Sequence, residues 1–386
     1  MKKKNKNLKA FFALVRAGLF PVHGEGFKVN ESIFQDVKWE KIYQLAQEQS
    51  VQGLVLQGIE TVLGLWLKVH GSPLAPKVLL LQWIGEVQVI EQRNKEMNAF
   101  IAELIEKLRK NNIYALLVKG QGVAQCYEKP YWRCSGDIDL LLSNDNYHKA
   151  YEYLTPLATK MDGEKEYTQH QALTISGWEV ELHGTLRSGL WGRLEQTVDE
   201  VQKAVFYEGN IRSWQNGETQ VFLPDVNEDV FFVFSHILQH FFKGGIGLRQ
   251  ICDWCRLLWQ YKDTLNIELL EKRLRAAGIM SEWKAFGSLA VNMLGMPVEA
   301  MPLYSSEIKW KKKADGILSY ILETGNFGHN RDVSYQKNTP ALHRKFITMW
   351  RQTKDNAVHF LIFPKDSIKA WWSIFVAGIK DAVRGK

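Results

Sequence analysis

Two aspartates separated by one residue, Asp137 and Asp139, lie just before an apolar run at 140–142. Side chains along a strand alternate between its two faces, so both carboxylates would share one face while Ile138 points to the other. Carboxylates held side by side raise each other's pKa unless a cation lies between them. Mg²⁺ suits such a pair because it prefers oxygen ligands and often shares its coordination shell with substrate phosphates. The spacing predicts a metal site in an enzyme that handles phosphates.

The residues around the aspartates favour this interpretation. Residues 113–118 read as a strand, Lys119-Gly120 begins a turn, and a helix is expected over 123–127. Arg133 and a Ser135-Gly136 turn then lead to the aspartates. Exposed backbone N–H groups in a turn, together with Lys and Arg, are suited to hold a triphosphate opposite the metal. Taken alone, an Asp-x-Asp sequence is more typical of an ordinary solvated turn than of a metal site.

A third acid, which a two-metal site requires, is predicted within residues 178–184. Apolar and polar residues alternate there, with the period of a half-buried strand. Glu179, Glu181 and His183 would share the face turned away from the core. Alternation alone does not choose between the two glutamates.

Three segments carry a family resemblance: Lys119-Gly120, Arg133-x-Ser135-Gly136-Asp137-Ile138-Asp139-Leu140-Leu141 and Glu181-Leu182-His183. They resemble the bacterial uncharacterised nucleotidyltransferase family of the polymerase-β-like superfamily. The resemblance implies an α+β fold, with a small mixed β-sheet flanked by helices and with helical regions on either side of it in the sequence. By position it implies that Asp137, Asp139 and Glu181 are the catalytic residues and the ligands of a divalent metal, Mg²⁺ or Mn²⁺.

Two positions depart from the pattern of the superfamily. Glu181 stands where Asp is more usual and is one methylene longer. Lys119-Gly120 replaces the Gly-Ser that opens the site in the broader superfamily, so we expect Lys119 to replace the serine that holds phosphates. The expected nucleotide-binding residues are Lys119, Gly120, Arg133, Ser135 and Gly136. The resemblance extends into residues 236–253.

A second polar constellation lies on a predicted apolar helix over 231–242. His236, Gln239, His240 and Lys243 fall on one face by the three–four rule, and a glycine-rich turn separates them from Arg249. One interpretation is a helical hairpin whose histidines are satisfied in the core. In the other, this face closes over the sheet, and His240, Lys243 and Arg249 contact the nucleotide or the acceptor.

Two further expectations concern the roles of histidines. His183 is expected either to orient the acceptor or to make a structural hydrogen bond to the backbone. His236 and His240 are four residues apart, but the glutamate of a His-Glu-x-x-His zinc motif is missing, so zinc is not expected there.

Composition limits the partners and the compartment. The net charge of +7 comes largely from five lysines within residues 2–9, and no basic motif interleaved with aromatic residues accompanies it, so nucleic acid is not expected. Cys252 and Cys255 lie in an apolar helical pattern and read as packing thiols. No apolar run is long enough to cross a membrane, and Arg16 interrupts the apolar N-terminal segment. We expect a cytoplasmic protein with reduced cysteines and no membrane partner.

The chain divides into an N-terminal helical region over 1–95, a nucleotidyltransferase core over 96–224 and a C-terminal helical domain over 225–386. One long helix should run from about residue 78 to 111, and a helix over 145–154 should be capped by Asn144. The expected strands are 113–118, 137–142, 167–175, 178–184, 205–208 and 219–223.

Together these observations predict a nucleotidyltransferase. It would transfer a nucleoside monophosphate, with AMP favoured, from a nucleoside triphosphate to a hydroxyl of an unidentified small molecule or protein. The alternative is a nucleotide-binding regulatory protein that does not catalyse transfer.

Overall fold

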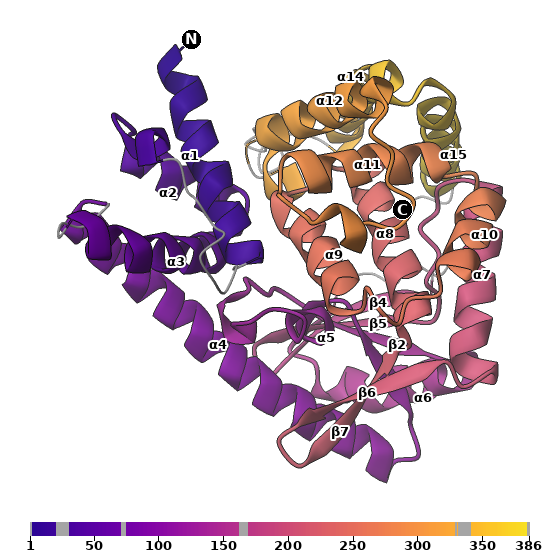
Figure 1. The fold of residues 1–386 in the computed structure, drawn as a ribbon. Coiled ribbons are helices and arrows are strands. Elements are labelled where there is room, and N and C mark those ends of the chain that lie inside the picture. Colours follow the sequence, from indigo (N-terminus) through magenta and orange to yellow (C-terminus); the bar gives the residue numbers. More distant parts are fainter. Residues whose placement is uncertain are drawn as a thin grey trace.

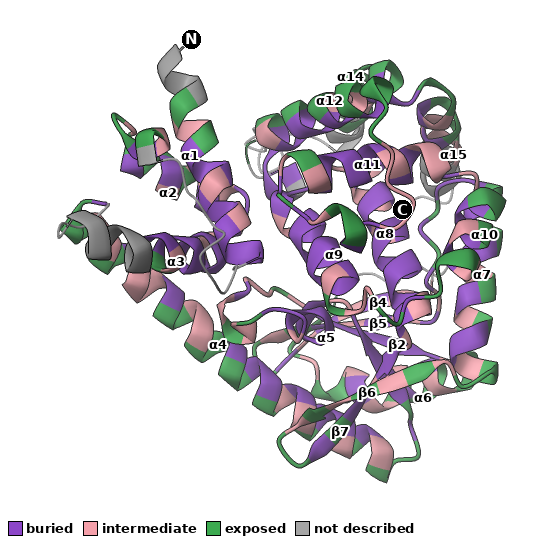
Figure 2. Ribbon diagram, viewed as in Figure 1, coloured by how far each residue is buried: buried purple, intermediate pink, exposed green. Residues whose placement is uncertain are grey.

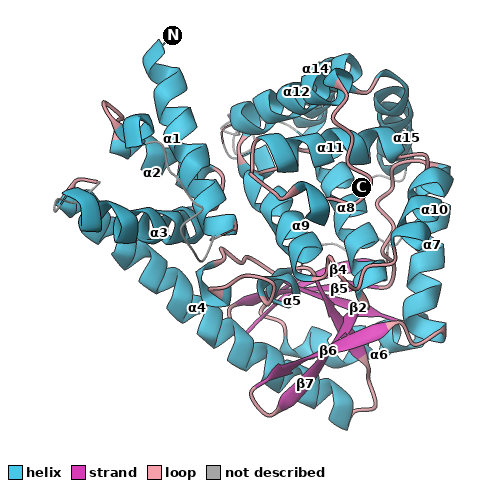
Figure 3. Cartoon of the chain, in the orientation of Figure 1, coloured by secondary structure: helices cyan, strands magenta, loops and turns pink. Residues whose placement is uncertain are grey.

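A computed structural model describes residues 2–20, 31–70, 75–161, 169–328, 330 and 341–383. Helices dominate, and the strands gather in one part of the molecule (Figure 3). The N-terminal helices lie to one side of the strands and the C-terminal helices lie above them (Figure 1). This confirms the predicted α+β class, with helical regions flanking a small sheet.

The N-terminal helices are α1 (Lys2–Leu19), α2 (Trp39–Glu48) and α3 (Gln52–His70), followed by the long helix α4 (Lys77–Lys110). The predicted long helix is therefore confirmed. Its apolar stripe, which includes Met97, Ile101 and Leu104, packs under the sheet against Ile138 and its neighbours. Helix α4 passes residue 95 without a break and leads from the N-terminal helices to the first strand of the sheet (Figure 1).

The close crossing of α1 and α3 depends on glycine. A Cβ added to Gly58 would lie 2.0 Å from the carbonyl oxygen of Leu14. We expect Gly58→Ala to lower the free energy of unfolding by about 1–3 kcal/mol, because the two helices must separate to accept a methyl group. Gly85 is the control, because it lies in α4 with no atom within 4 Å of its added Cβ.

Gly85→Ala should raise the free energy of unfolding by about 0.5–1 kcal/mol through helix propensity alone. Denaturant unfolding of both variants makes the comparison. A shift in the same direction for both would contradict the packing argument.

The main sheet has five strands in the order β1-β2-β5-β4-β3. They are β1 (Ala115–Val118), β2 (Ile138–Leu142), β3 (Lys160–Met161), β4 (His170–Ile175) and β5 (Trp178–His183). Strands β2 and β5 run parallel and the other neighbours run antiparallel, so the sheet is mixed, as predicted. Helices α5 (Gly120–Ala124) and α6 (Asn144–Leu154) follow β1 and β2.

Alternation along β2 separates two apolar layers. Ile138, Leu140 and Leu142 face the layer that contains α4, while Leu141 belongs to the larger cluster on the other side. Asp139 therefore shares the face of Leu141, opposite Ile138, as the sequence pattern indicates.

Three local predictions are wrong. Residues 205–208 are not a strand; they close helix α7 (Gly192–Tyr207) and enter a turn, because Leu194, Val198, Val201 and Val205 form a buried helical stripe. The partner of β7 (Thr219–Pro224) is instead β6 (Ile211–Asn216), in a separate two-stranded sheet.

The other two errors concern helix ends. Asn144 is the first residue of α6, and Ser143 holds the cap position. Helix α5 begins already at Gly120 and ends at Ala124, earlier than the expected 123–127.

The C-terminal region is a helical bundle (Figure 1). Its helices are α8 (Val226–Lys243), α9 (Leu248–Gln260), α10 (Ile267–Ala277), α11 (Met280–Asn292), α12 (Ile308–Thr324), α14 (Ala341–Ile362) and α15 (Pro364–Val383). Short 3₁₀ turns lie in this bundle at Val298–Ala300 and Asn326–Gly328, and earlier in the chain at Glu31–Phe34, Pro130–Trp132 and Thr155–Leu157. Helix α8 is buried along most of its length (Figure 2), so it forms the centre of this bundle.

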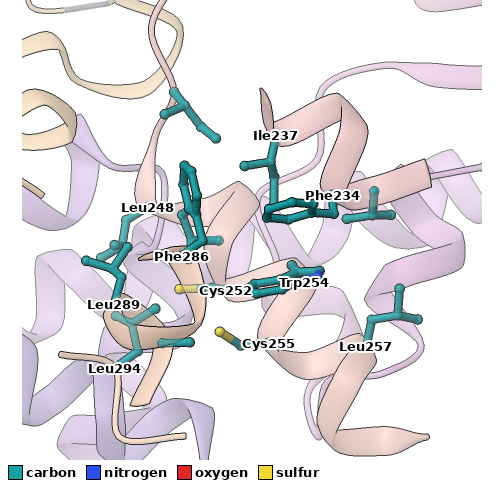
Figure 4. Close-up of a cluster of buried hydrophobic side chains, with 14 of the residues drawn as sticks. Phe234, Ile237, Leu248, Cys252, Trp254, Cys255, Leu257, Phe286, Leu289 and Leu294 are labelled. Atoms are coloured by element: carbon teal, nitrogen blue, oxygen red, sulfur yellow. The ribbon is translucent and has the colours of Figure 1, made fainter. Parts of the chain in front are cut away.

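The two cysteines of α9 are core residues. Cys252 and Cys255 are free thiols, fully buried among apolar side chains that include Phe234 and Phe286 (Figure 4). Burial raises the pKa of the Cys255 thiol far above its ordinary value, which disfavours the reactive thiolate. The prediction of packing thiols is confirmed.

Among the described residues, no helix has both the length and the apolar character of a membrane span.

Candidate active site

A cavity of about 450 Å³ lies between the sheet and helices α8 and α9. The sheet contributes residues of β2, β4 and β5, and the turn between β1 and α5 contributes Lys119 and Gly120. Of the predicted site residues, those that line it are Lys119, Gly120, Arg133, Gly136, Asp137, Asp139, Glu181, His183, His240, Lys243 and Arg249. Ser135 is not among the lining residues.

Strand pairing brings the three acids together. Asp139 lies directly beside Glu181 in the parallel β2–β5 pair, and Asp137 precedes Asp139 by two residues on the same face. Oxygen atoms of all three carboxylates lie within 4.8 Å of one another. Glu179 instead pairs with Thr174 and is exposed, outside the cavity. The structure thus selects Glu181, which the alternation of residue types could not do.

Asp139 is the most enclosed of the three acids, with 2% of its surface exposed. Its Oδ1 lies 2.6 Å from the Lys119 Nζ and 2.8 Å from the His183 Nε2. Burial opposes ionisation of Asp139, but Lys119 and then His183 outweigh it and hold the pKa of this carboxyl below its usual range. Asp139 is thus a carboxylate that two nitrogen groups already stabilise.

Lys119 reaches Asp139 from a strained backbone. Its φ is 57° and its ψ is −141°, and a positive φ is uncommon for a residue other than glycine. Strain of this kind persists where the surrounding structure enforces it, most often at functional sites. Burial lowers the pKa of Lys119, yet Asp139 and Asp137 exceed this effect and raise it, so the ammonium stays charged.

Asp137 differs from its neighbours. Within the described part of the chain its carboxylate makes no hydrogen bond and no ion pair. The charge of Asp139, followed by burial, raises the pKa of Asp137. An oxygen donor of this kind, beside two further carboxylates and open to a cavity, fits a hard divalent cation.

His183 contacts carboxylates rather than the backbone. Its Nε2 lies 2.8 Å from Asp139 and 3.3 Å from Glu181. Burial lowers the pKa of His183, but the hydrogen bonds to Asp139 and Glu181 raise it further than burial lowers it. His183 therefore links the two acids that β2 and β5 bring together.

Arg133 and Ser135 hold the loop that precedes Asp137. The Arg133 guanidinium donates from Nε and Nη2 to the two carboxylate oxygens of Asp253, each at 2.7 Å, and from Nη1 to the Ser135 Oγ at 3.0 Å. The Ser135 Oγ also accepts from Gln121 Nε2 at 3.1 Å. Both predicted phosphate contacts thus have structural partners, and Gly136 is the exposed part of this loop.

The polar stripe of α8 faces the cavity. His236, Gln239, His240 and Lys243 all line it, so this face closes over the sheet. Lys243 Nζ donates to the Ser188 carbonyl at 2.5 Å, and Arg249 Nη1 donates to the Cys134 carbonyl at 2.7 Å.

The two histidines of this stripe are neutral. Burial first, and then the charge of Lys119, lowers the pKa of His240 to about 4 and that of His236 well below its ordinary value. Their Nε2 atoms lie 2.9 Å apart. Near neutral pH they offer hydrogen-bond donors and acceptors rather than charge.

Sequence reasoning missed two residues of the site, His170 and Asp253. His170 lies directly opposite His183, and its Nε2 is 2.9 Å from the Glu181 Oε2. A signal existed: the predicted strands 167–175 and 178–184 are separated by Ser176 and Gly177 alone, and counting back from a two-residue hairpin turn pairs 170 with 183, as the structure shows. Asp253 gave no local signal, because its partner Arg133 is 120 residues away in sequence.

The chain can be compared with known proteins at the level of structure and at the level of family. Among solved structures, the chain is similar to an antigenic nucleotidyltransferase-like protein from Paracoccidioides brasiliensis, with 14% identity, a TM-score of 0.30, and coverage of 47% of this chain and 86% of that chain. No curated protein matches the chain. The profile of a family described as "Uncharacterised nucleotidyltransferase" matches residues 35–295, a span that includes the main sheet and every residue named above as lining the cavity. The resemblance seen in the motifs is confirmed, and the chain belongs to the uncharacterised nucleotidyltransferase family.

Proposed function

We propose that this protein is a Mg²⁺-dependent enzyme that transfers a nucleoside monophosphate from a nucleoside triphosphate to a hydroxyl group. AMP is the favoured nucleotide, and the acceptor is a small molecule or a protein. The observation that carries the proposal is the convergence of Asp137, Asp139 and Glu181 on one side of a cavity. Lys243 and Arg249 enter the same cavity from α8 and α9, which gives it cations for phosphate oxygens.

The three acids supply what a metal-bound triphosphate needs. Asp137, Asp139 and Glu181 would hold Mg²⁺ or Mn²⁺, which when bound supplies positive charge that orients the phosphates and neutralises charge developing on them. Lys119 lines the same space with its ammonium, and Gly120 and Gly136 bring backbone without a side chain against it. These residues would bind and orient the phosphate tail, as the sequence pattern predicts for a strand–turn–strand site.

The remaining groups position the site. Arg133 and Ser135 fix the loop that carries Asp137, and His183 fixes Asp139 relative to Glu181. His240 is uncharged and faces the cavity, so it would orient a hydroxyl acceptor or a base edge by hydrogen bonding.

Calorimetry with Mg²⁺ and each of the four nucleoside triphosphates tests the site. We expect the double variant Asp137→Asn, Asp139→Asn to lose Mg²⁺-dependent binding while keeping its fold, because amides do not replace two ionised metal ligands. Glu179→Gln is the matched control, since it removes an exposed acid from the same strand as Glu181. Equal affinity in the double variant and the wild type would overturn the assignment.

Catalysis needs a separate measurement. Incubation with labelled ATP, Mg²⁺ and a candidate acceptor should replace a hydroxyl proton of the acceptor by an adenylyl group, which adds the mass of AMP less one water, and release pyrophosphate. Binding of nucleotide without pyrophosphate release, across small-molecule and protein acceptors, would favour the regulatory alternative.

A further inference from the structure

A second group of metal donors adjoins the three carboxylates. His170 on β4 and His183 on β5 are direct cross-strand partners, so both rings project from the same face of the sheet. Their ring centroids are 4.7 Å apart, with an angle of 59° between the planes. Glu181 lies two residues before His183 on β5, on the same face. The hairpin thus directs two imidazoles and one carboxylate toward a common point.

The separations of these donor atoms suit a coordinated ion. The Glu181 Oε2 lies 2.9 Å from the His170 Nε2 and 3.3 Å from the His183 Nε2, and all three donors lie within 4.8 Å of one another. Two ligands held at about 2.0–2.2 Å from a tetrahedral ion are about 3.3–3.6 Å apart. Small side-chain movements, in which the His183 Nε2 exchanges its hydrogen bond to Asp139 for the ion, would bring all three into one coordination shell. All three residues line the cavity, so an ion has a path of entry.

The donor types differ from those of the neighbouring acids. Asp137, Asp139 and Glu181 offer oxygen only, which suits Mg²⁺, whereas imidazole nitrogen favours transition-metal dications. We propose that His170, Glu181 and His183 form a second metal site that binds Mn²⁺, Co²⁺ or Zn²⁺ in preference to Mg²⁺ and shares Glu181 with the oxygen-only site. Its role rests on the proposed function, in which the second ion would lie beside the bound triphosphate.

The alternative role for His170 is simpler. In it, His170 only donates a hydrogen bond that orients Glu181, as a histidine does outside a metal's coordination shell. The two roles differ in a measurable way, because loss of a ligand changes the donor set and hence the visible spectrum of bound Co²⁺, whereas loss of an orienting hydrogen bond lowers the affinity and leaves the donor set unchanged.

Titration of the full chain with Co²⁺, after treatment with chelator, tests the site by visible absorption. We expect the wild type to bind Co²⁺ with a spectrum of nitrogen and oxygen ligation, and a large excess of Mg²⁺ to leave that spectrum in place. His170→Asn should weaken Co²⁺ binding and change the spectrum to that of a site with one nitrogen ligand fewer. The control is His148→Asn, which replaces an exposed histidine on α6, outside the cavity. An unchanged spectrum in His170→Asn, at whatever affinity, or displacement of Co²⁺ from the wild type by an equal concentration of Mg²⁺, would overturn the proposal.

The same protein separates this proposal from the proposed function. Asp137→Asn should keep the Co²⁺ spectrum while losing Mg²⁺-dependent nucleotide binding. If the wild type binds Co²⁺ through His170 but shows no Mg²⁺-dependent nucleotide binding, the transferase proposal fails and the second metal site stands. If the wild type binds nucleotide with Mg²⁺ but gives no Co²⁺ spectrum, the second metal site fails and the transferase proposal stands.

Discussion

Replacement of Asp253 by alanine should lower the free energy of unfolding by about 3–5 kcal/mol. Asp253 and Arg133 are 6% and 9% exposed, and two hydrogen bonds of 2.7 Å join them. Breaking a buried pair on one side is costly because the remaining charge is neither paired nor hydrated. Tyr127, whose hydroxyl donates to Asp253 Oδ1 at 2.8 Å, would also lose its acceptor. Denaturant unfolding at neutral pH gives the measurement.

An exposed ion pair nearby provides the control for Asp253. Lys262 pairs with Asp263, whose side chain is 82% exposed. Asp263→Ala should change stability by less than about 0.5 kcal/mol, because exposed pairs contribute little. A loss below about 1 kcal/mol in Asp253→Ala would mean that Arg133 finds another partner or reaches solvent. In the folded fraction of Asp253→Ala, we also expect weaker Mg²⁺-dependent nucleotide binding, since Arg133 would no longer hold the loop before Asp137.

The second large effect expected on stability concerns Glu282, in the C-terminal bundle. This residue of α11 is completely buried, and burial, followed by the charge of Asp366 on α15, raises its pKa well above the ordinary value. The folded state therefore keeps Glu282 protonated over a pH range in which the unfolded chain has ionised it. Stability falls through that range, from about pH 4.5 upward, by about 1.4 kcal/mol for each pH unit.

Glu282→Gln should remove this loss. The amide has the shape of the protonated acid and no charge to expose on unfolding. We expect the free energy of unfolding of the variant, relative to that of the wild type, to rise by about 2–3 kcal/mol as the pH goes from 5 to 7. Denaturant unfolding at each pH gives the measurement. Glu323→Gln, at an exposed position of α12, should leave the pH profile parallel to that of the wild type. A Glu282→Gln profile parallel to the wild type would show that the carboxyl ionises in the folded protein.

The sequence predicted the parts of the site that local pattern controls. Alternation of residue types placed Asp137 and Asp139 on one face of β2 and Glu181 with His183 on one face of β5. The three–four spacing placed His236, His240 and Lys243 on one side of α8. Apolar periodicity gave α4 nearly to the residue. Each of these depends on neighbours within one element, which is the information that a single sequence holds.

Other features depend on contacts between distant segments. The choice of Glu181 over Glu179 follows from the register of β5 against β2, which no residue of β5 reveals alone. Arg133 was predicted to meet phosphate, and its pairing with Asp253 depends on how α9 packs over the sheet. Valine and phenylalanine at positions 205 and 206 favour strands, but burial of one face of α7 outweighs that preference.

The loop that precedes Asp137 is held from three directions. Asn94 of α4 donates to the carbonyls of Tyr131 and Arg133, each at 2.7 Å, and Arg249 of α9 donates to the carbonyl of Cys134. Gln121 of α5 adds its bond to Ser135. A fragment limited to residues 96–224 would contain the acids but lack Asn94, Arg249 and Asp253. The placement of Asp137 therefore depends on side chains from outside the sheet region, and a protein cut down to residues 96–224 would lack the contacts that hold this loop.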